Sequence, residues 1–284
     1  MADLFERRCV VIVEGLRVEG LRTSFKVAKT SSKQPNTLDL AIYNLSPESR
    51  GSLKKKGALV QLEAGYRQDV AMIFQGNARL IDHKHEGSDW ITRVQCGDGE
   101  VAYQNRTIYE SHAAGVSTVA LLKRLISTMG VEPGNAIEAA QEAVRAGRPQ
   151  GFANGYVFEG RCSYYLDKLF KTLDLPWSIQ NGALFVPTEK QQTVFEFSPD
   201  NGLVGSPEQG VNTATKTKEK KTSVKAKVLL CPSLRIGSMV SLRSAQQKGI
   251  FVIQNLGHSG DTHGGEWYSE FEATPTTKFV RVAA

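Results

Sequence analysis

The stretch Leu38-Asp39-Leu40-Ala41-Ile42-Tyr43-Asn44 contains the clearest alternation of apolar and polar side chains in the sequence. Leu38, Leu40 and Ile42 fall on one face of an extended segment, because successive side chains of a strand point to opposite sides. The stretch therefore predicts a half-buried β-strand. Turn residues separate it from similar strand patterns at 11–18, 23–29, 58–65, 70–81 and 90–96. Strands of this length and spacing indicate a small β-barrel or sandwich over residues 1–103.

One short helix is expected inside this first β domain. Ser46 can cap its N-terminus, Pro47 suits the first helical position, and Gly57 marks the point by which the helix has ended. A serine cap satisfies a free backbone N–H, and a proline there loses no helical hydrogen bond.

The period changes to that of helices in the middle of the chain. Residues 117–129, 133–146 and 163–173 predict helices, and Gly130 is placed to end the first of them. Residues 151–160 are expected to form a strand pair or a loop. The segment 177–186 predicts a hairpin, since Asn181-Gly182 is the preferred two-residue turn between strands. Residues 104–190 therefore form a predicted α+β insertion domain.

Strand patterns return near the C-terminus, at 193–197, 225–230, 239–243, 249–256 and 268–273. They predict a second β domain over residues 191–284, with a long lysine-rich loop at 207–224. The predicted fold class is therefore mainly β with an α+β insertion. Two β domains that flank an insertion suggest duplication of a barrel, although their sequences show no visible repeat.

The composition of the 284 residues is that of a globular protein, with 40% hydrophobic and 23% charged residues. The first eight residues lack a signal-peptide pattern, and the densest apolar run, Cys9 to Val13, is far shorter than the roughly 20 residues of a membrane span. The sequence predicts a soluble chain without stable membrane insertion.

The four cysteines predict neither a disulfide framework nor a zinc ribbon. They stand at 9, 96, 162 and 231 in apolar surroundings, and no CxxC pair occurs. Buried free thiols made in a reducing cytosol are the expected state.

Recognisable catalytic motifs are missing from the sequence: it has no P-loop, GxGxxG, GxSxG or HExxH pattern. The loop that contains His258, Asp261, His263 and Glu266 carries metal-ligand types, and residues 82–86 add further histidines and acids. Because the loop is rich in glycine, it is expected to be a polar hairpin tip instead of a metal site. A hydrolase based on Ser259 is disfavoured, because neighbouring residues rarely face one another as a triad requires.

Two further patterns favour a structural interpretation over a chemical one. Asp98 and Glu100 would suit a glycosidase only if they were paired in space, so they are expected in a solvated turn. Tyr164 and Tyr165 open a helix, where core packing is expected instead of base stacking. The net charge of +6 arises largely in the lysine tract at 215–227, which is expected to be a solvated loop. The sequence thus predicts no catalytic residue, no cofactor and no metal ion.

Several segments together resemble the tail or baseplate hub proteins of bacteriophages. The resemblance is carried, in order, by Asp39 to Ser46, 57–66 with Ala64-Gly65-Tyr66, Ile73-Phe74-Gln75-Gly76, 177–186, 202–208, 229–237, His258 to Asp261, and Glu266-Trp267-Tyr268. It covers nearly the whole chain, and the order of the segments is more specific than any one of them.

This resemblance implies a definite role. Hubs of this kind are homotrimers in which each chain contributes two tube-like β domains to a pseudo-sixfold ring. The ring adapts the sixfold tail tube to a threefold central spike and forms part of the DNA channel. The implied partners are two further copies of the chain, the tail tube or a distal tube ring, the spike and other baseplate proteins, with DNA only as passing cargo.

The implied location is the tail of the virion, after assembly in the host cytoplasm. Two alternatives stay open: a distal tail or tube-initiator protein, and a cell-wall hydrolase of the tail tip. The chain shows no lysozyme-like segment, so the hub interpretation predicts a protein that is not an enzyme.

Overall fold

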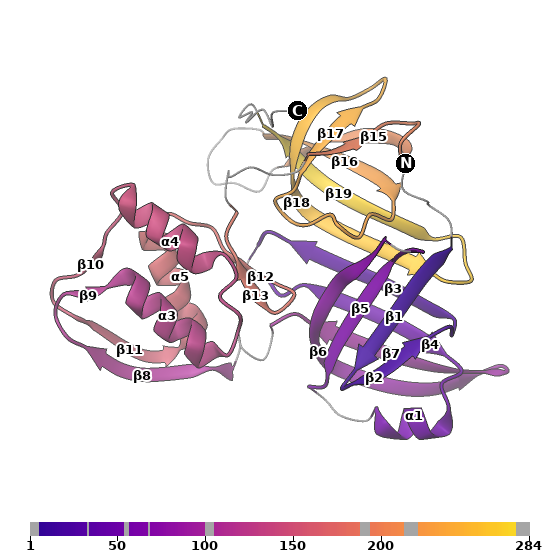
Figure 1. Ribbon diagram of the computed structural model, residues 1–284, viewed down its shortest axis with the longest axis horizontal. Coiled ribbons are helices and arrows are strands. Elements are labelled where there is room, and N and C mark those ends of the chain that lie inside the picture. Colours follow the sequence, from indigo (N-terminus) through magenta and orange to yellow (C-terminus); the bar gives the residue numbers. More distant parts are fainter. Residues whose placement is uncertain are drawn as a thin grey trace.

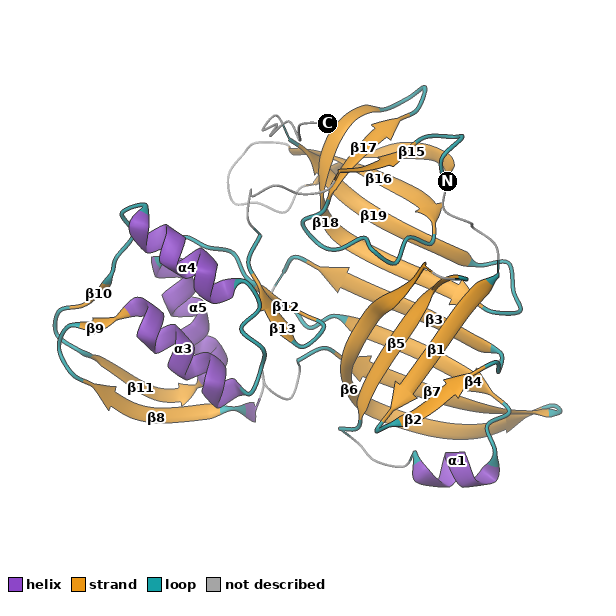
Figure 2. Ribbon diagram, in the orientation of Figure 1, coloured by secondary structure: helices purple, strands orange, loops and turns teal. Residues whose placement is uncertain are grey.

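The computed structural model describes residues 6–32, 34–53, 57–67, 69–99, 105–187, 194–212 and 221–276. Strands dominate the chain, and helices are concentrated in its middle third (Figure 2). The predicted fold class, mainly β with an α+β insertion, is confirmed. We refer to residues 6–99, 105–187 and 194–276 as the first β unit, the insertion unit and the second β unit.

Among its described residues, the first β unit has seven strands and one short helix. The predicted strand around Leu40 is β4, and its burial alternates as expected, with Leu38, Leu40 and Ile42 buried. Helix α1 (Pro47–Ser52) begins as predicted, because the Ser46 side chain accepts a hydrogen bond from the Ser49 N–H. The strands are β1 (Arg7–Val13), β2 (Leu16–Glu19), β3 (Thr23–Thr30), β4 (Thr37–Tyr43), β5 (Leu59–Tyr66), β6 (Asp69–Glu86) and β7 (Asp89–Gly97).

The insertion unit packs three helices against short strands (Figure 1). Helix α3 (Thr118–Met129) ends as predicted at Gly130, whose φ of 69° is a left-handed conformation that suits glycine. The predicted hairpin is confirmed as β12 (Ser178–Gln180) and β13 (Ala183–Phe185). The other elements are β8 (Thr107–His112), β9 (Val116–Ser117), α4 (Ala136–Arg145), β10 (Gly151–Phe152), β11 (Tyr156–Arg161) and α5 (Cys162–Thr172).

The strands in 151–160 do not pair with each other. Strand β10 pairs with β9, and β11 pairs with β8, in two separate antiparallel ladders.

The second β unit continues the sheet of the first one. Its strands are β14 (Val194–Phe197), β15 (Leu203–Asn212), β16 (Lys221–Leu229), β17 (Met239–Arg243), β18 (Lys248–Asp261) and β19 (Trp267–Pro275). Residues 255–261 of β18 pair antiparallel with residues 24–30 of β3. One sheet therefore runs from β15 through β16, β19, β18, β3, β4, β7, β6, β5 and β1 to β2, and among the described residues it does not close into a barrel.

Part of the predicted lysine-rich loop at 207–224 is strand instead. Residues 207–212 belong to β15 and residues 221–224 to β16, and these strands pair antiparallel. The mixture of glycine, proline and lysine in this segment disfavours strands, so the sequence indicated a loop. The remaining residues, 213–220, lie outside the described residues.

The two β units share core residues as well as a sheet. Leu230 and Trp267 come from the second β unit but belong to the apolar core of the first one. Trp267 is 1% exposed, and its ring meets Phe25 edge to face with centroids 5.4 Å apart. The first β unit therefore depends on the second for a complete core.

No helix in the part of the chain that the structure describes is both long and apolar enough to span a membrane.

Candidate assembly surface

A polar face extends over both β units, on the side of the sheet opposite the cores. The registers align Lys225, Glu272 and Asn255 in one row and Lys227, Glu270 and Gly257 in the next. Two further rows lie on the first β unit. One consists of Lys26, Asp39, Gln95 and Leu80, and the other of Ser24, Ala41, Arg93 and Asp82 together with Asp261 of β18. Because side chains alternate along a strand, these residues share one face.

The charges on this polar face sum to a small negative value. Among its described side chains five cations face eight carboxylates, which gives 5 − 8 = −3, whereas the whole chain carries +6. They are Lys26, Lys84, Arg93, Lys225 and Lys227, with Asp39, Asp82, Glu86, Asp89, Glu208, Asp261, Glu270 and Glu272. The basic excess of the chain therefore lies elsewhere.

Neighbouring charges on the polar face pair with one another. Lys227 Nζ lies 2.9 Å from Glu270 Oε1, and this hydrogen bond raises the pKa of the lysine. Glu272 accepts hydrogen bonds from Asn255 Nδ2 at 2.9 Å and Ser223 Oγ at 2.8 Å, which lower the pKa of its carboxyl. Exposed pairs of this kind contribute little to stability, about 0 to 1 kcal/mol each. They leave a surface with little net attraction for a polyanion.

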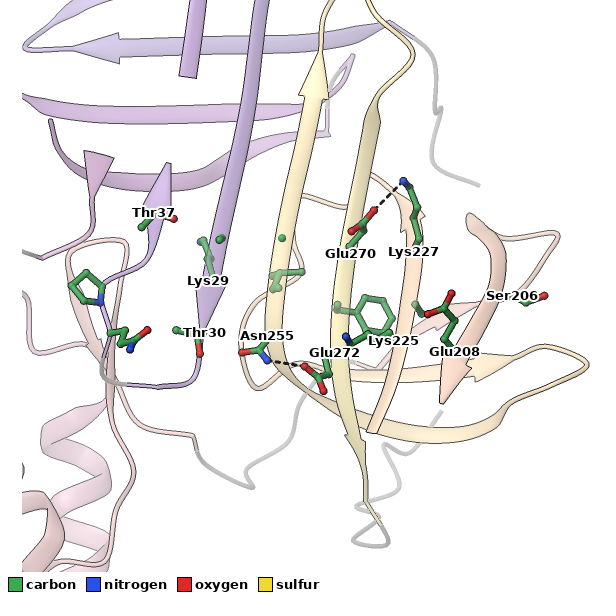
Figure 3. Close-up of a pocket in the computed structure, with 17 residues that line it drawn as sticks. Lys29, Thr30, Thr37, Ser206, Glu208, Lys225, Lys227, Asn255, Glu270 and Glu272 are labelled. Carbon is green, nitrogen blue, oxygen red and sulfur yellow. Dashed lines mark hydrogen bonds and ion pairs between the residues drawn. The ribbon is translucent and has the colours of Figure 1, made fainter. Parts of the chain in front are cut away.

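Small residues in the middle of the polar face leave a hollow of about 720 Å³ (Figure 3). Ala28 and Gly257 form part of its floor, the Gln34–Pro35 loop lines one side, and Ser206 and Glu208 of β15 line the other. A second hollow of about 460 Å³ follows on the first β unit, beside Lys26 and Arg93. Both are open to solvent and lined by side chains of both charges.

The prediction of a polar hairpin tip that contains His258, Asp261, His263 and Glu266 is correct only for the residues that follow Asp261. His258 lies inside β18, is 1% exposed, and its Nδ1 is 2.8 Å from Ser269 Oγ. Asp261 instead binds Arg22, with Nη2 2.9 Å from Oδ2. His263 and Glu266 are exposed at the turn. The glycines around His258 suggested a turn, but pairing with β3 and β19 holds this segment as a central strand.

The other possible metal ligands do not join this group. His83 Nδ1 lies 3.0 Å from Thr92 Oγ1, and the ring of His85 packs against Trp90, both at the far end of the sheet. Within the described ranges, no group of three or more histidine, cysteine, aspartate or glutamate residues is placed to hold a metal ion.

His258 should make stability depend on pH. Burial lowers its pKa from 6.5 to about 3, so the folded state keeps the ring neutral where the unfolded state protonates it. The unfolded state then binds more protons below pH 6.5, and stability present at pH 7 is lost as the pH falls toward 3. We expect a loss of about 2 kcal/mol between pH 7 and 5 from this residue alone.

Urea unfolding at pH 7, 6 and 5 measures this effect. His258→Gln should flatten the pH dependence, whereas the matched variant His263→Gln, at an exposed position, should keep that of the unmodified chain. Equal slopes for His258→Gln and the unmodified chain would contradict the assignment.

The expected solvated turn at Asp98 is wrong, because Asp98 is fully buried. Its carboxylate accepts hydrogen bonds from the N–H groups of Asn181 and Gly182, at 2.6 and 2.8 Å, and from Asn36 Nδ2 at 3.1 Å. These contacts bind the tip of the β12–β13 hairpin to the first β unit. Burial nevertheless raises the pKa of Asp98 above its ordinary value. Glu100 lies outside the described residues.

Lys29 completes this junction. Its side chain is 6% exposed and donates a hydrogen bond to Asn181 Oδ1 at 3.0 Å, and burial lowers its pKa to about 8. Nothing in the sequence near Lys29 or Asn36 indicates this role, because their partners lie about 150 positions away. The only available signal was Asn181-Gly182, which predicted the turn but not its contact.

The remaining candidate residues have structural surroundings. Tyr165 is buried and its hydroxyl lies 2.8 Å from the Glu159 N–H, whereas Tyr164 is 61% exposed, contrary to the expected core packing of both. All four cysteines are free; Cys9, Cys96 and Cys162 are buried and Cys231 is half-buried. Burial raises the pKa of Cys9 and of Cys96 to about 12, so neither thiol is reactive at neutral pH.

Comparison with known proteins finds similarity at the level of structure alone. No protein-family model and no curated protein sequence matches the chain. A tail protein from Neisseria meningitidis superimposes with a TM-score of 0.67 at 8% identity, over 95% of this chain and 97% of that one. The 43 kDa tail protein of prophage MuSo2 from Shewanella oneidensis gives 0.66 at 10% identity, over 94% and 96%.

A component of the Escherichia coli type VI secretion system, itself described as similar to T4 tail proteins, gives a TM-score of 0.56 at 9% identity, over 94% of this chain and 77% of that one. The chain therefore has the fold of phage tail proteins, and the resemblance seen in the sequence is confirmed at the level of the fold.

Proposed function

We propose that this chain is a structural hub of a phage-type tail. In this proposal it acts as a homotrimer that joins a sixfold tail tube to a threefold central spike and performs no catalysis. The observation that carries the proposal is the match to tail proteins over nearly the full length of both chains, through the two β units and the insertion unit alike.

The two β units support this role. Each contributes strands to one continuous sheet, so three chains in a closed ring would present six β units to a tube. A cyclic ring needs an extended surface on each subunit that continues onto the next one. The polar face provides such a surface across the whole sheet.

In the same proposal the polar face lines the channel. Its formal charge of −3 over thirteen charged residues gives DNA phosphates no strong site to hold. Tight binding of DNA would need many uncompensated cations, since affinity follows the number of phosphates neutralised. A surface without an excess of cations lets DNA pass.

Native mass measurement tests the hub proposal. The purified chain should form a species of about 93 kDa (3 × 31.1 kDa), alone or with its candidate spike partner. A sixfold mass would favour the alternative of a distal tail or tube-initiator protein. Strict monomers in the presence of a spike partner would contradict the proposal.

A further inference from the structure

Two strands at opposite ends of the polar face have open edges in the isolated chain. Strand β15 pairs with β16 on one side, and on its other side no strand of the described residues pairs with it. Strand β6 is divided: residues 69–77 pair with β5, whereas residues 78–86 pair with β7 alone among the described strands. An unpaired edge presents N–H and C=O groups to any strand that can complete the ladder.

We propose that residues 80–86 of β6 in one copy pair with β15 in the next copy, so that the sheet continues from subunit to subunit. The proposal rests on the ring of the hub proposal and names the contact that closes it. The strand that pairs with the open edge therefore comes from a second copy of this chain.

The direction of the strands supports this pairing. The sheet has eight strands from one edge to the other, counting both edge strands: β15, β16, β19, β18, β3, β4, β7 and β6. Each neighbouring pair among them is antiparallel. With an even number of strands, β15 and β6 run in opposite directions. Copies related by rotation about a ring axis therefore meet antiparallel, as the seven neighbouring pairs among these eight strands do.

The side chains at the two edges favour one register. Leu80, Asp82 and Lys84 lie on the polar face, as Glu208 does on β15. An antiparallel register with Lys84 opposite Glu208 joins opposite charges and places Asp82 opposite Gly210. Cross-strand pairs of opposite charge stabilise antiparallel sheets, and directly opposed like charges destabilise them. In the isolated chain Lys84 instead contacts Glu86, with 3.2 Å between Nζ and Oε1.

The form of the edges limits where pairing can occur. The ladder of β15 is irregular between Val204 and Glu208, where Pro207 has no N–H to donate, and is regular from Glu208 to Asn212. Residues 80–86 contain neither proline nor glycine, and Leu80 is 52% exposed at the edge of the polar face. The regular half of β15 therefore suits this part of β6, and the joined copies would cover Leu80.

Engineered cysteines test the contact directly. Directly opposed residues of an antiparallel pair have Cβ atoms about 4.5–5.5 Å apart, close enough for a disulfide with small adjustment. The double variant Lys84→Cys with Glu208→Cys should, after mild oxidation, migrate largely as covalent dimers and trimers in non-reducing electrophoresis. The matched control, Lys84→Cys with Arg17→Cys, uses β2, which is also an edge strand but lies elsewhere in the sheet, and should remain monomeric there.

Charge exchange gives a second readout. Lys84→Glu alone and Glu208→Lys alone should each lower the trimer fraction about tenfold at fixed concentration, and the double exchange should restore it. A native trimer with no Lys84–Glu208 cross-link and no rescue would overturn the edge contact and leave the hub proposal standing. Monomers at every concentration would overturn both, and cross-linking of the β2 control would overturn the specificity of the contact.

Discussion

Replacement of Asp98 by alanine is expected to lower the free energy of unfolding by about 3 kcal/mol and to release the β12–β13 hairpin from the first β unit. The variant removes the acceptor of two backbone N–H groups and of Asn36 Nδ2, all of them buried or partly buried. It also removes the carboxylate whose charge favours the protonated form of the buried Lys29. Unpaired buried donors and charges are among the most destabilising changes known.

Hydrogen exchange of the Asn181 and Gly182 amides measures this release. Their protection should fall in Asp98→Ala, while that of helix α3 persists because its packing lies within the insertion unit. Asp39→Ala is the matched control, since Asp39 is exposed on β4, and it should change stability by less than about 0.5 kcal/mol. Undiminished protection at Asn181 and Gly182 would refute the role of Asp98 as the anchor of the hairpin.

Trp267→Ala is expected to have the largest effect of any single substitution considered, a loss of about 3–5 kcal/mol. Trp267 comes from β19 but fills the core of the first β unit beside Phe25. The variant would leave a cavity where the two β units meet, so both should lose stability together. Chemical denaturation followed by circular dichroism measures the change.

Trp267→Phe is the control for this prediction. The indole Nε1–H has no hydrogen-bond partner among the described residues, so the loss should come from volume alone and be much smaller than that of alanine. A similar loss in both variants would show that packing against Phe25 does not account for the effect. An unchanged midpoint in Trp267→Ala would contradict the shared core.

Local elements of the fold could be predicted from the sequence because their signals are local. The alternation around Leu40, the Ser46 cap and the Asn181-Gly182 turn each involve residues within a few positions of one another, and each was confirmed. Strand β15 was missed, since its glycines and proline disfavour a strand in isolation and pairing with β16 overrides that preference.

The contacts that join the units could not be predicted in the same way. Asp98 meets Asn181 across 83 positions, and nothing in either segment indicates the other. His258 illustrates the same limit: its glycine neighbours indicate a turn, but strands from both β units enclose it. Burial of a polar residue is decided by such distant pairing, which a single sequence does not reveal.

The ladder between β3 and β18 also determines the order in which the molecule can be completed. Ser24 pairs with Asp261, a separation of 261 − 24 = 237 positions, so the first strand of this ladder leaves the ribosome long before its partner exists. At roughly 5–20 residues per second, that interval is on the order of ten seconds or more. During this interval, β3 of the nascent first β unit can pair with β4 but not with β18, and the unit lacks the Trp267 indole that fills its core. Contacts so distant in sequence slow folding, so completion of the first β unit waits for the synthesis of β18 and β19.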